Sequence, residues 1–553
     1  MKFLLYADEH GVRPDANADC TEALARLLET RGCDAEIRFR PGIYRFGADH
    51  ASRRSYAISN SDPAPSQNVS ILLEGCRNLI LDFGGSALLF RGQTIALGLD
   101  RCENVTILNA SVDWDVPFSA EGEILTAGPG EITVAIDPLR YPHEVQDGKL
   151  LFRGPGWQSS AFFGALEFDR ATGRVRPGAG DTFPPVTVSQ EKPGVVRMQG
   201  AFSPLPIPGN LLVLRHGKRV HPGLFCQNSR GIRLENVTFH STCGLGALFQ
   251  FSQDIAVCRT SFLPNRARGR RILSGHDDGL HFSNCRGDVS ITECRFAGLM
   301  DDAINVHGTS VRIEALEGRR LRGRFCHPQS TGFHSWAAAG DRISFLNRDT
   351  MDSLGVLEAA EFRLETPETF QLTLSGPVPA QIRPGDALEN LSNTPSVHCC
   401  RNLFGSGRAR GILVTTPQPV YIADNRFETS GCALLLGGDA NGWYESGGCR
   451  DVEICRNVFT EHCLSSKYQF CEGIVSICPE VRDMAHSQGF HRNVRIHHNV
   501  FYDCGMPLLY AQCVKNLEFR DNVIHACLPP DREAGPRVQC RFCSLTEEGN
   551  VTA

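Results

Sequence analysis

The stretch Asn493-Val494-Arg495-Ile496, followed after two further residues by Asn499-Val500-Phe501, decides the fold because both halves recur along the chain. The first half returns as Asn78-Leu79-Ile80-Leu81, Asn104-Val105-Thr106-Ile107, Asn236-Val237-Thr238-Phe239, Asp288-Val289-Ser290-Ile291, Asp451-Val452-Glu453-Ile454 and Asn516-Leu517-Glu518-Phe519. The second half returns as Cys294-Arg295-Phe296, Asn425-Arg426-Phe427 and Asn457-Val458-Phe459. Apolar alternation is typical of β-strands, and Asn is typical of turns. The chain is therefore a repeat of short strands.

A third recurring strand reads as Gly or Ala followed by apolar residues. Its copies are Gly246-Ala247-Leu248-Phe249, Asp278-Gly279-Leu280-His281-Phe282, Asp302-Ala303-Ile304-Asn305-Val306, Arg410-Gly411-Ile412-Leu413-Val414, Cys432-Ala433-Leu434-Leu435-Leu436 and Glu472-Gly473-Ile474-Val475. The step from Asp278 to Asp302 is 24 residues, and the step from Arg410 to Cys432 is 22. Three short strands in such a period predict an all-β parallel β-helix, whose coils stack at ~4.8 Å.

Two segments lack the repeat and predict inserted domains. Residues 118–220 and 310–393 are rich in strand and turn signals, and each is long enough for a small β-barrel. The β-helix would then occupy 1–117, 221–309, with the catalytic coils, and 394–553. An amphipathic helix from Asp19 to Thr30 is expected to cap the first coil within the N-terminal segment, because the end of a β-helix is otherwise open.

Stacking in register turns a column of the repeat into a row of neighbouring side chains. One column holds Gly246, Asp278, Asp302, Arg410, Cys432 and Glu472, and another holds Phe249, His281, Asn305, Leu413, Leu435 and Val475. Asp278, His281, Asp302 and Asn305 should therefore share one outward face on two adjacent coils, with Asp277 and Asp301 one residue ahead of each aspartate.

Carboxylates stacked in this way repel one another and should differ in pKa, which is the arrangement of paired-carboxylate acid–base catalysis. Two other interpretations remain open at this point: a solvated acidic turn, and a calcium or other metal site that adds His276 and His307.

Two further segments suit a sugar ligand. Arg408-Ala409-Arg410-Gly411 lies in the Asp column and offers bidentate donors, unless it is only surface charge. Asp439 to Gly447 brings Trp443 and Tyr444 next to Glu445, and an aromatic ring beside a carboxylate matches the apolar face and the hydroxyls of a sugar. A plain loop is the alternative for this segment.

Composition and charge exclude several classes of protein. The 553 residues carry 56 Lys and Arg against 62 Asp and Glu, so the net charge of −6 gives no reason to expect a nucleic-acid partner. No apolar run is long enough to cross a membrane. The 23 cysteines, scattered through apolar strands, indicate buried thiols in a reducing compartment. The N-terminal apolar run is too short for a signal peptide, which predicts a cytoplasmic protein.

The chain resembles glycoside hydrolase family 110, the bacterial exo-α-1,3-galactosidases, some of which remove the terminal galactose of the blood group B antigen. The motifs that carry the resemblance are His276-Asp277-Asp278-Gly279-Leu280-His281-Phe282, Asp301-Asp302-Ala303-Ile304-Asn305-Val306-His307-Gly308, Arg408-Ala409-Arg410-Gly411 and Trp443-Tyr444-Glu445-Ser446-Gly447. The resemblance implies a right-handed parallel β-helix with two inserted β-barrels, and an inverting hydrolysis that needs neither a metal nor a cofactor. The layout is also similar to that of the polygalacturonases.

The resemblance implies roles for the motif residues. Asp301 would be the general acid, and Asp278 and Asp302 would hold and deprotonate the attacking water, with Asp277 as the alternative to Asp278. The residues expected to contact the substrate are His281, Asn305, His307, Arg408, Arg410, Trp443, Glu445 and Asp277. The expected partner is a galactose-terminated oligosaccharide or glycan, with no nucleic acid and no membrane, and the inserted barrels offer contact surfaces for a homo-oligomer.

Two other functions fit the same pattern. One is a polygalacturonase-like hydrolase or a uronate lyase or epimerase, of which a lyase would need calcium and a base for the C5 proton. The other is a non-catalytic glycan-binding β-helix.

Overall fold

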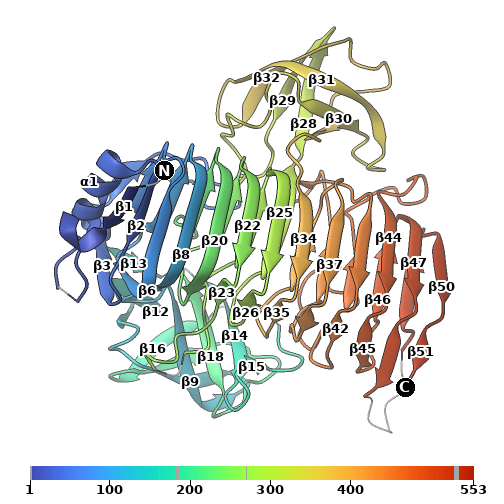
Figure 1. Ribbon diagram of the computed structural model, residues 1–553. Helices are drawn as coiled ribbons and strands as arrows, with labels where there is room; N and C mark the ends of the chain where they lie inside the picture. Colours follow the sequence, from blue (N-terminus) through green and yellow to red (C-terminus); the bar gives the residue numbers. More distant parts are fainter. Residues whose placement is uncertain (1–2, 16, 161, 181–185, 270, 528–534) are drawn as a thin grey trace.

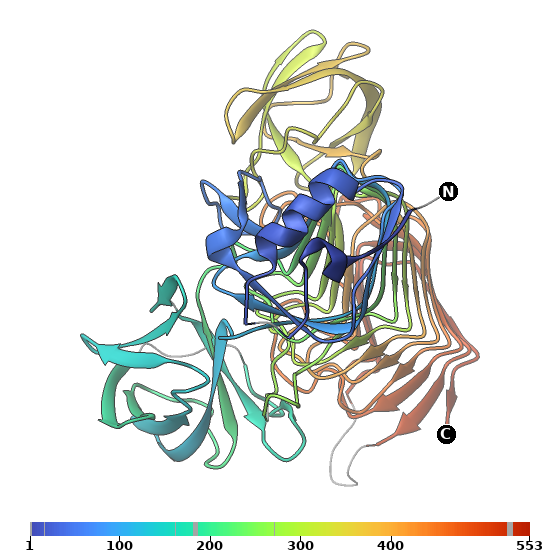
Figure 2. The same cartoon turned by 60° about the vertical axis from the view of Figure 1, so that its left-hand side comes forward.

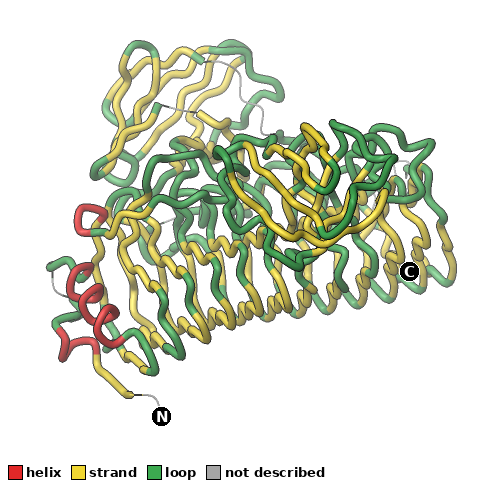
Figure 3. Tube along the Cα trace, turned by 90° about the horizontal axis from the view of Figure 1, so that it is seen from above, coloured by secondary structure: helices red, strands yellow, loops and turns green. Residues whose placement is uncertain are grey.

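The protein is a parallel β-helix with two inserted β-domains, which confirms the predicted fold class (Figure 1). The computed structural model describes residues 3–15, 17–160, 162–180, 186–269, 271–527 and 535–553. Strands stack in parallel along the helix axis, and Figure 3 shows them side by side as successive rungs. No α-helix among the described residues is long and apolar enough to cross a membrane.

One sheet of the β-helix carries the third recurring strand. Its members are β4 (Ser52–Arg54), β5 (Gln67–Glu74), β7 (Ile95–Asp100), β19 (Leu224–Gln227), β21 (Ala247–Gln250), β24 (Leu280–Ser283), β27 (Ile304–Thr309), β36 (Ile412–Val414), β39 (Leu434–Leu436), β43 (Val475–Ile477), β46 (Leu509–Gln512) and β49 (Val538–Arg541). The short strand β40 (Glu445–Ser446) pairs with β27.

The other sheet holds the two Asn-marked strands of each coil. The first coils contribute β1 (Phe3–Tyr6), β2 (Ala35–Arg38), β3 (Ile43–Gly47), β6 (Ile80–Arg91) and β8 (Glu103–Trp114). The longer strands that follow are β20 (Arg230–Phe239), β22 (Gln253–Cys258), β25 (Arg286–Thr292), β34 (Ser396–Cys400), β37 (Val420–Ala423), β41 (Val452–Cys455), β44 (His491–His497), β47 (Val514–Arg520) and β50 (Leu545–Glu548). The shorter ones are β23 (Ser261–Phe262), β26 (Arg295–Phe296), β35 (Leu403–Phe404), β38 (Arg426–Phe427), β42 (Val458–Phe459), β45 (Val500–Asp503), β48 (Val523–Ala526) and β51 (Val551–Thr552).

The Asn and Phe of the Asn-x-Phe signal have separate physical roles. The Asn side chains form an amide ladder of Asn402, Asn425, Asn457, Asn499, Asn522 and Asn550, in which each Nδ2 bonds the next Oδ1 at 3.0–3.1 Å. The Phe rings stack coil on coil, with centroids 4.5 Å apart for Phe404 and Phe427. The Asn row satisfies the hydrogen bonds of buried polar groups, and the Phe row packs apolar rings in the core. These two roles explain why the signal recurs.

We expect Asn457→Ala to lower the free energy of unfolding by at least about 2 kcal/mol. The Asn457 Oδ1 accepts from the backbone N–H of Asn425, and its Nδ2 donates to the carbonyl of Ile422, so the substitution removes the side-chain partners of buried groups. Urea unfolding followed by circular dichroism measures this. Asn550→Ala is the matched control, because water reaches that half-buried last rung. Equal losses in both variants would contradict the explanation.

The sheet of the third recurring strand is called here the site-bearing sheet. Its strand register corrects the ends of both predicted columns. His281, Asn305, Leu413 and Leu435 stand opposite one another as expected. Leu248 and Ser476 complete this row, however, in place of Phe249 and Val475. By the same pairing, Gly246 falls opposite Gly279 and Gly473 opposite Cys432, so Gly246 and Glu472 lie one residue out of the Asp278 row. At the first end the neighbours Leu248 and Phe249 are both apolar, so hydropathy alone could not set the register there.

The Gly or Ala before each third strand reflects close stacking of the coils. A Cβ added at Gly246 would lie 2.2 Å from the carbonyl oxygen of Gly279, and one at Gly279 would lie 2.6 Å from that of Ala303. A larger side chain would force the coils apart and misplace the residues that precede the strands.

The first coil is covered by α1 (Thr21–Arg31), close to the predicted Asp19 to Thr30 (Figure 2). Its buried face of Leu24, Leu27 and Leu28 joins the core of the β-helix. The carboxylate of Asp19 accepts from the backbone N–H of Thr21 at 2.7 Å, one of the orphan donors at the helix start. The 3₁₀ turns Ala7–His10 and Ala48–His50 flank this cap.

Both insertions are antiparallel, and each has its own hydrophobic core. The first pairs β15 (Arg174–Val175), β14 (Phe162–Asp169), β18 (Leu211–His216), β9 (Ser119–Gly128), β10 (Glu131–Ile136), β17 (Val195–Gln199) and β16 (Thr187–Lys192), with a second sheet of β11 (His143–Gln146), β12 (Lys149–Gly154) and β13 (Trp157–Ser159). The second closes into a barrel of β28 (Val311–Glu317), β29 (Arg320–Arg324), β32 (Thr369–Leu374), β31 (Ser353–Leu364), β30 (Arg342–Leu346) and β33 (Ala387–Asn390). Figure 1 shows them projecting from the β-helix at two places.

Candidate active site

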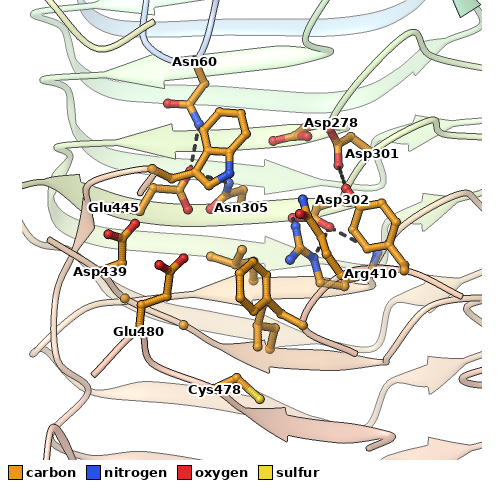
Figure 4. A pocket seen from close by; sticks show the side chains of 18 of the residues that line it. Asn60, Asp278, Asp301, Asp302, Asn305, Arg410, Asp439, Glu445, Cys478 and Glu480 are labelled. Atoms are coloured by element: carbon orange, nitrogen blue, oxygen red, sulfur yellow. Dashed lines mark hydrogen bonds and ion pairs between the residues drawn. The ribbon is translucent and has the colours of Figure 1, made fainter. Parts of the chain in front are cut away.

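Two adjoining cavities lie on the outer face of the site-bearing sheet. The inner cavity, of about 650 Å³, is lined by Asp278, Asp301, Asp302, Asn305, Arg410, Trp443 and Glu445 among others (Figure 4). The outer cavity, of about 1050 Å³, is lined by residues that include Asp277, Asp301, Arg408 and Trp443. The structure therefore brings the predicted carboxylates, both arginines and the Trp443-Glu445 segment together, although they come from four separate stretches of sequence.

Asp278, Asp302 and Arg410 stand in one row because each is the second residue before a paired strand. Asp278 precedes β24, Asp302 precedes β27 and Arg410 precedes β36, and these strands pair in parallel and in register. Backbone hydrogen bonds continue this register into the turns before the strands. For example, the N–H of Gly279 donates to the carbonyl of Asp302 at 2.9 Å. Successive coils thus place these three side chains next to one another.

Asp302 is a buried carboxylate held by one arginine. Its two oxygens accept from Arg410 Nε at 2.7 Å and from Arg410 Nη2 at 2.9 Å. Burial raises the pKa of Asp302 to about 6, although Arg410 opposes that rise and the charge of Asp301 adds to it. Asp302 is therefore ionised at neutral pH and titrates just below it, in the range that suits a general base.

Asp278 holds a proton through a chain of histidines. His307 Nδ1 lies 2.7 Å from the carbonyl of Gly308, so that nitrogen must carry a hydrogen. His281 Nε2 lies 2.9 Å from His307 Nε2, and His281 Nδ1 lies 2.7 Å from Asp278 Oδ2. A His281 that donates through Nε2 accepts through Nδ1. The carboxyl of Asp278 is thereby assigned as the donor.

The electrostatics of this buried chain agree with that assignment. Burial, helped by the charges of Asp301 and Asp302, raises the pKa of Asp278 well above its usual range. Burial, with His307 and Arg219 nearby, lowers the pKa of His281 well below its usual range. His281 and His307 are fully buried behind Asp278 and do not line either cavity. Their ring nitrogens bond one another and His281 bonds Asp278, so in this structure they support Asp278, and a contact with substrate stays a prediction.

Asp301 lines both cavities. Its Oδ1 accepts from the hydroxyl of Tyr468 at 2.9 Å, and its Oδ2 lies 3.8 Å from Arg219 Nη1. Arg408 Nη1 lies 3.9 Å from Oδ1, and its guanidinium stacks over the Tyr468 ring at 4.9 Å. Asp301 is thus oriented from three sides at the junction between the two cavities.

Asp277 is committed to an ion-pair network in the wall of the outer cavity. Its Oδ2 lies 2.7 Å from His276 Nδ1, and its Oδ1 accepts from Arg215 Nη2 at 3.0 Å. Burial alone would raise the pKa of Asp277, but His276, Arg219 and Arg215 together hold it below its usual range. Of the two alternatives from sequence, Asp278 is the one that lines the inner cavity beside Asp301 and Asp302.

The wall opposite the three aspartates offers polar contacts for a sugar (Figure 4). Glu445 Oε1 accepts from Asn60 Nδ2 at 2.8 Å and from Asn305 Nδ2 at 3.4 Å. Asn305 Oδ1 is buried and has no hydrogen-bond partner among the described residues. A buried acceptor without a partner is costly, so this oxygen is well placed to accept from a ligand hydroxyl.

Trp443 bridges the two cavities. The residue is 36% exposed, and its ring packs at a tilt against that of His327 in the second barrel, with centroids 4.5 Å apart. Arg219 lies over the same ring at 5.7 Å. An exposed indole at this junction can receive the apolar face of a sugar.

Several lining residues escaped the sequence analysis. They include Asn60, Arg219, Tyr468 and Glu480. They lie in loops or at the edges of insertions, outside the repeat, so no column pointed to them. Glu480 adds a half-buried carboxyl whose pKa is raised to about 7 by burial and by Asp439 and Glu445.

The side-chain positions also bear on the metal alternative. Among the described residues, the only three His, Cys, Asp or Glu side chains whose ligand atoms lie within 4.8 Å of one another are Glu453, Cys455 and His497, far along the β-helix. Asp278, Asp302, His276 and His307 do not converge in this way, because each histidine points at another partner.

Comparisons with known proteins find relatives over most of the chain. Residues 120–212 match the family model "GLAA-B beta-barrel domain I", and residues 320–388 match "GLAA-B beta-barrel domain II". The chain is 37% identical over 530 residues to α-1,3-galactosidase B of Bacteroides thetaiotaomicron, covering 94% of this chain and 86% of that protein. It is 34% identical over 518 residues to α-1,3-galactosidase B of Akkermansia muciniphila, covering 93% and 64%. The exopolygalacturonase of Thermotoga maritima matches over 99% of this chain and 91% of that one, with 11% identity and a TM-score of 0.43, a likeness too distant to inform the reaction.

Proposed function

The chain belongs to the family of the α-1,3-galactosidases and is therefore a glycoside hydrolase that acts on galactosides, and from this premise we propose that it is an exo-acting, inverting enzyme of glycoside hydrolase family 110. Its substrates are glycans that end in Galα1-3Gal, such as the blood group B determinant. The observation that carries the proposal is the position of Asp301, which lines both cavities, while Asp278 and Asp302 line only the inner one.

The two cavities supply a binding mode. The terminal galactose enters the inner cavity, where Asn305, Glu445 and Arg410 meet its hydroxyls. The rest of the glycan occupies the wider outer cavity, next to Trp443. The glycosidic oxygen then lies at the junction, beside Asp301, so one terminal residue is released at each turnover.

The positions of the three aspartates supply a mechanism. Asp301 donates its proton to the leaving glycosidic oxygen, held in place by Tyr468. Asp302, kept ionised by Arg410, takes a proton from water that attacks the opposite face of the anomeric carbon. Asp278, already protonated through His281, orients that water. An inverting site needs its acid and base ~6.5–9.5 Å apart to leave room for the water.

We expect β-galactose to be the first product. A proton NMR time course with linear Galα1-3Gal and with the fucosylated B trisaccharide, in parallel tubes, would record the anomer before mutarotation. The tube that reacts identifies the accepted aglycone. The appearance of α-galactose first would contradict inversion, and an absence of turnover in both tubes would contradict the substrate class.

We expect kcat/KM to fall as the pH drops below about 6. Asp302 must be ionised to act as the base, and its raised pKa of about 6 places its protonation there. Activity should therefore approach a tenfold loss for each further pH unit below this value. A profile from pH 4.5 to 8, with stability checked at each pH, measures this. A limb near the ordinary pKa of an aspartate, ~4, would argue against Asp302 as the base.

A further inference from the structure

A second group of chemically active side chains lies on the outer face of the sheet of Asn-marked strands, in the C-terminal coils. Glu453 and Cys455 are alternate residues of β41 and point outward, and His497 of β44 stands directly opposite Cys455. Parallel pairing in register therefore brings a carboxylate, a thiol and an imidazole together, although 42 residues separate Cys455 from His497 in sequence.

The distances between these ligand atoms are those of a metal site. His497 Nε2 lies 3.4 Å from Glu453 Oε1, and Cys455 Sγ lies 3.7 Å from the same oxygen. Tetrahedral zinc, with bonds of ~2.0–2.3 Å, separates a nitrogen from an oxygen ligand by about 3.4 Å and a sulfur from an oxygen ligand by about 3.6 Å. All three atoms lie within 4.8 Å of one another. An ion would thus need little rearrangement of the side chains.

The outer contacts of the cluster also suit a metal. His497 Nδ1 is 2.8 Å from His498 Nδ1, which anchors the ring and leaves Nε2 directed at Glu453 and Cys455. Glu453 is about one-third exposed, so an ion can arrive from solvent. Arg456 Nη1 contacts the Cys455 sulfur at 3.1 Å, as a donor to a metal-bound thiolate would.

Charge around the cluster is negative despite three arginines. Arg456 pairs with Asp424, Arg495 with Asp451, and Arg520 with Glu518 and Asp521. Those four carboxylates already outnumber the three guanidinium groups, and Glu453, whose Oε2 lies 3.6 Å from Arg495 Nη2, adds a fifth. A divalent cation would therefore enter a region with a surplus of negative charge.

We propose that Glu453, Cys455 and His497 form a binding site for a zinc-class divalent cation, which joins two adjacent coils and leaves one coordination position for water. Mixed carboxylate, thiolate and imidazole ligands select zinc or cobalt over calcium or magnesium. The site is separate from the sugar cavities, and its ligands line neither of them. It is thus independent of the proposed hydrolysis, and bound metal would stabilise the folded chain by mass action.

Cobalt binding to the full-length, chelator-treated protein tests the proposal. We expect Co²⁺ to produce a thiolate-to-metal absorption band in the near ultraviolet and visible bands of tetrahedral cobalt, and Zn²⁺ to abolish both. Cys455→Ser should lose the thiolate band, and His497→Gln should weaken binding by more than about tenfold. Zn²⁺ should raise the unfolding temperature of the wild type but not of Cys455→Ser.

The control is Cys400→Ser, since Cys400 occupies the same outward column two coils earlier and has none of the three ligands as a pairing neighbour. This variant should keep the cobalt spectrum. Galactosidase activity reports folding for all three variants, because none of the substituted residues lines a sugar cavity. No band in the wild type, a band that survives Cys455→Ser, undiminished binding in His497→Gln, or a band lost in Cys400→Ser would overturn the proposal.

Discussion

Asp301→Asn is expected to lower kcat/KM on Galα1-3Gal by about 10²–10⁴-fold, the usual contribution of a general acid. Asparagine keeps the shape of the side chain and can still accept from Tyr468, but it has no proton to give to the leaving sugar oxygen. A sugar alkoxide is a poor leaving group, so this oxygen depends on protonation. The measurement is steady-state release of galactose by wild type and variant.

The leaving group provides the control for this experiment. An aryl α-galactoside with an acidic phenol leaves without protonation, so Asp301→Asn should lose far less activity on that substrate than on the disaccharide. Equal losses on both substrates would mean that Asp301 binds or positions galactose without acting as the acid. Unchanged activity on both would remove Asp301 from the mechanism.

Asp302→Ala is expected to cost at least as much, because it removes the base and leaves Arg410 without its buried partner. The base contributes about 10²–10⁴-fold. Loss of one member of a buried ion pair destabilises by about 3–5 kcal/mol. Arg410 makes both of its carboxylate contacts to Asp302, so the variant should also unfold at lower temperature. Rate and unfolding temperature should be measured on the same preparation.

Azide separates the chemical role of Asp302 from its structural one. A small anionic nucleophile needs no base, so it should restore turnover in Asp302→Ala and yield β-galactosyl azide, the inverted product. Asp278→Ala serves as the matched variant: if Asp278 only orients water, azide should rescue it less. Failure of azide to rescue a folded Asp302→Ala, or formation of the α-azide, would contradict the assigned base or the inversion.

Much of the inner cavity could be predicted from sequence, because in a β-helix residues that are one repeat apart in sequence lie side by side on adjacent coils. The step of 24 residues places Asp278 beside Asp302 before any tertiary contact is known. Errors arose at the ends of the columns, where apolar neighbours such as Leu248 and Phe249 were interchangeable by hydropathy. The burial of His281 and His307 could not be predicted, because strand alternation indicates which face a residue occupies but not what covers that face.

The sequence by itself determined the coil, the row of aspartates and the arginine that joins it, since local periodicity specifies all three. The tertiary structure alone decided which loops complete the cavities, because Asn60, Arg219 and Tyr468 reach them through contacts of no fixed period. It alone also decided where the proton resides, because the pKa of Asp278 depends on burial and on its histidine chain. Likewise Glu453, Cys455 and His497 became one cluster only through the register of β41 and β44. A repeat specifies which residues are neighbours, while solvent exclusion and long-range packing set their chemistry.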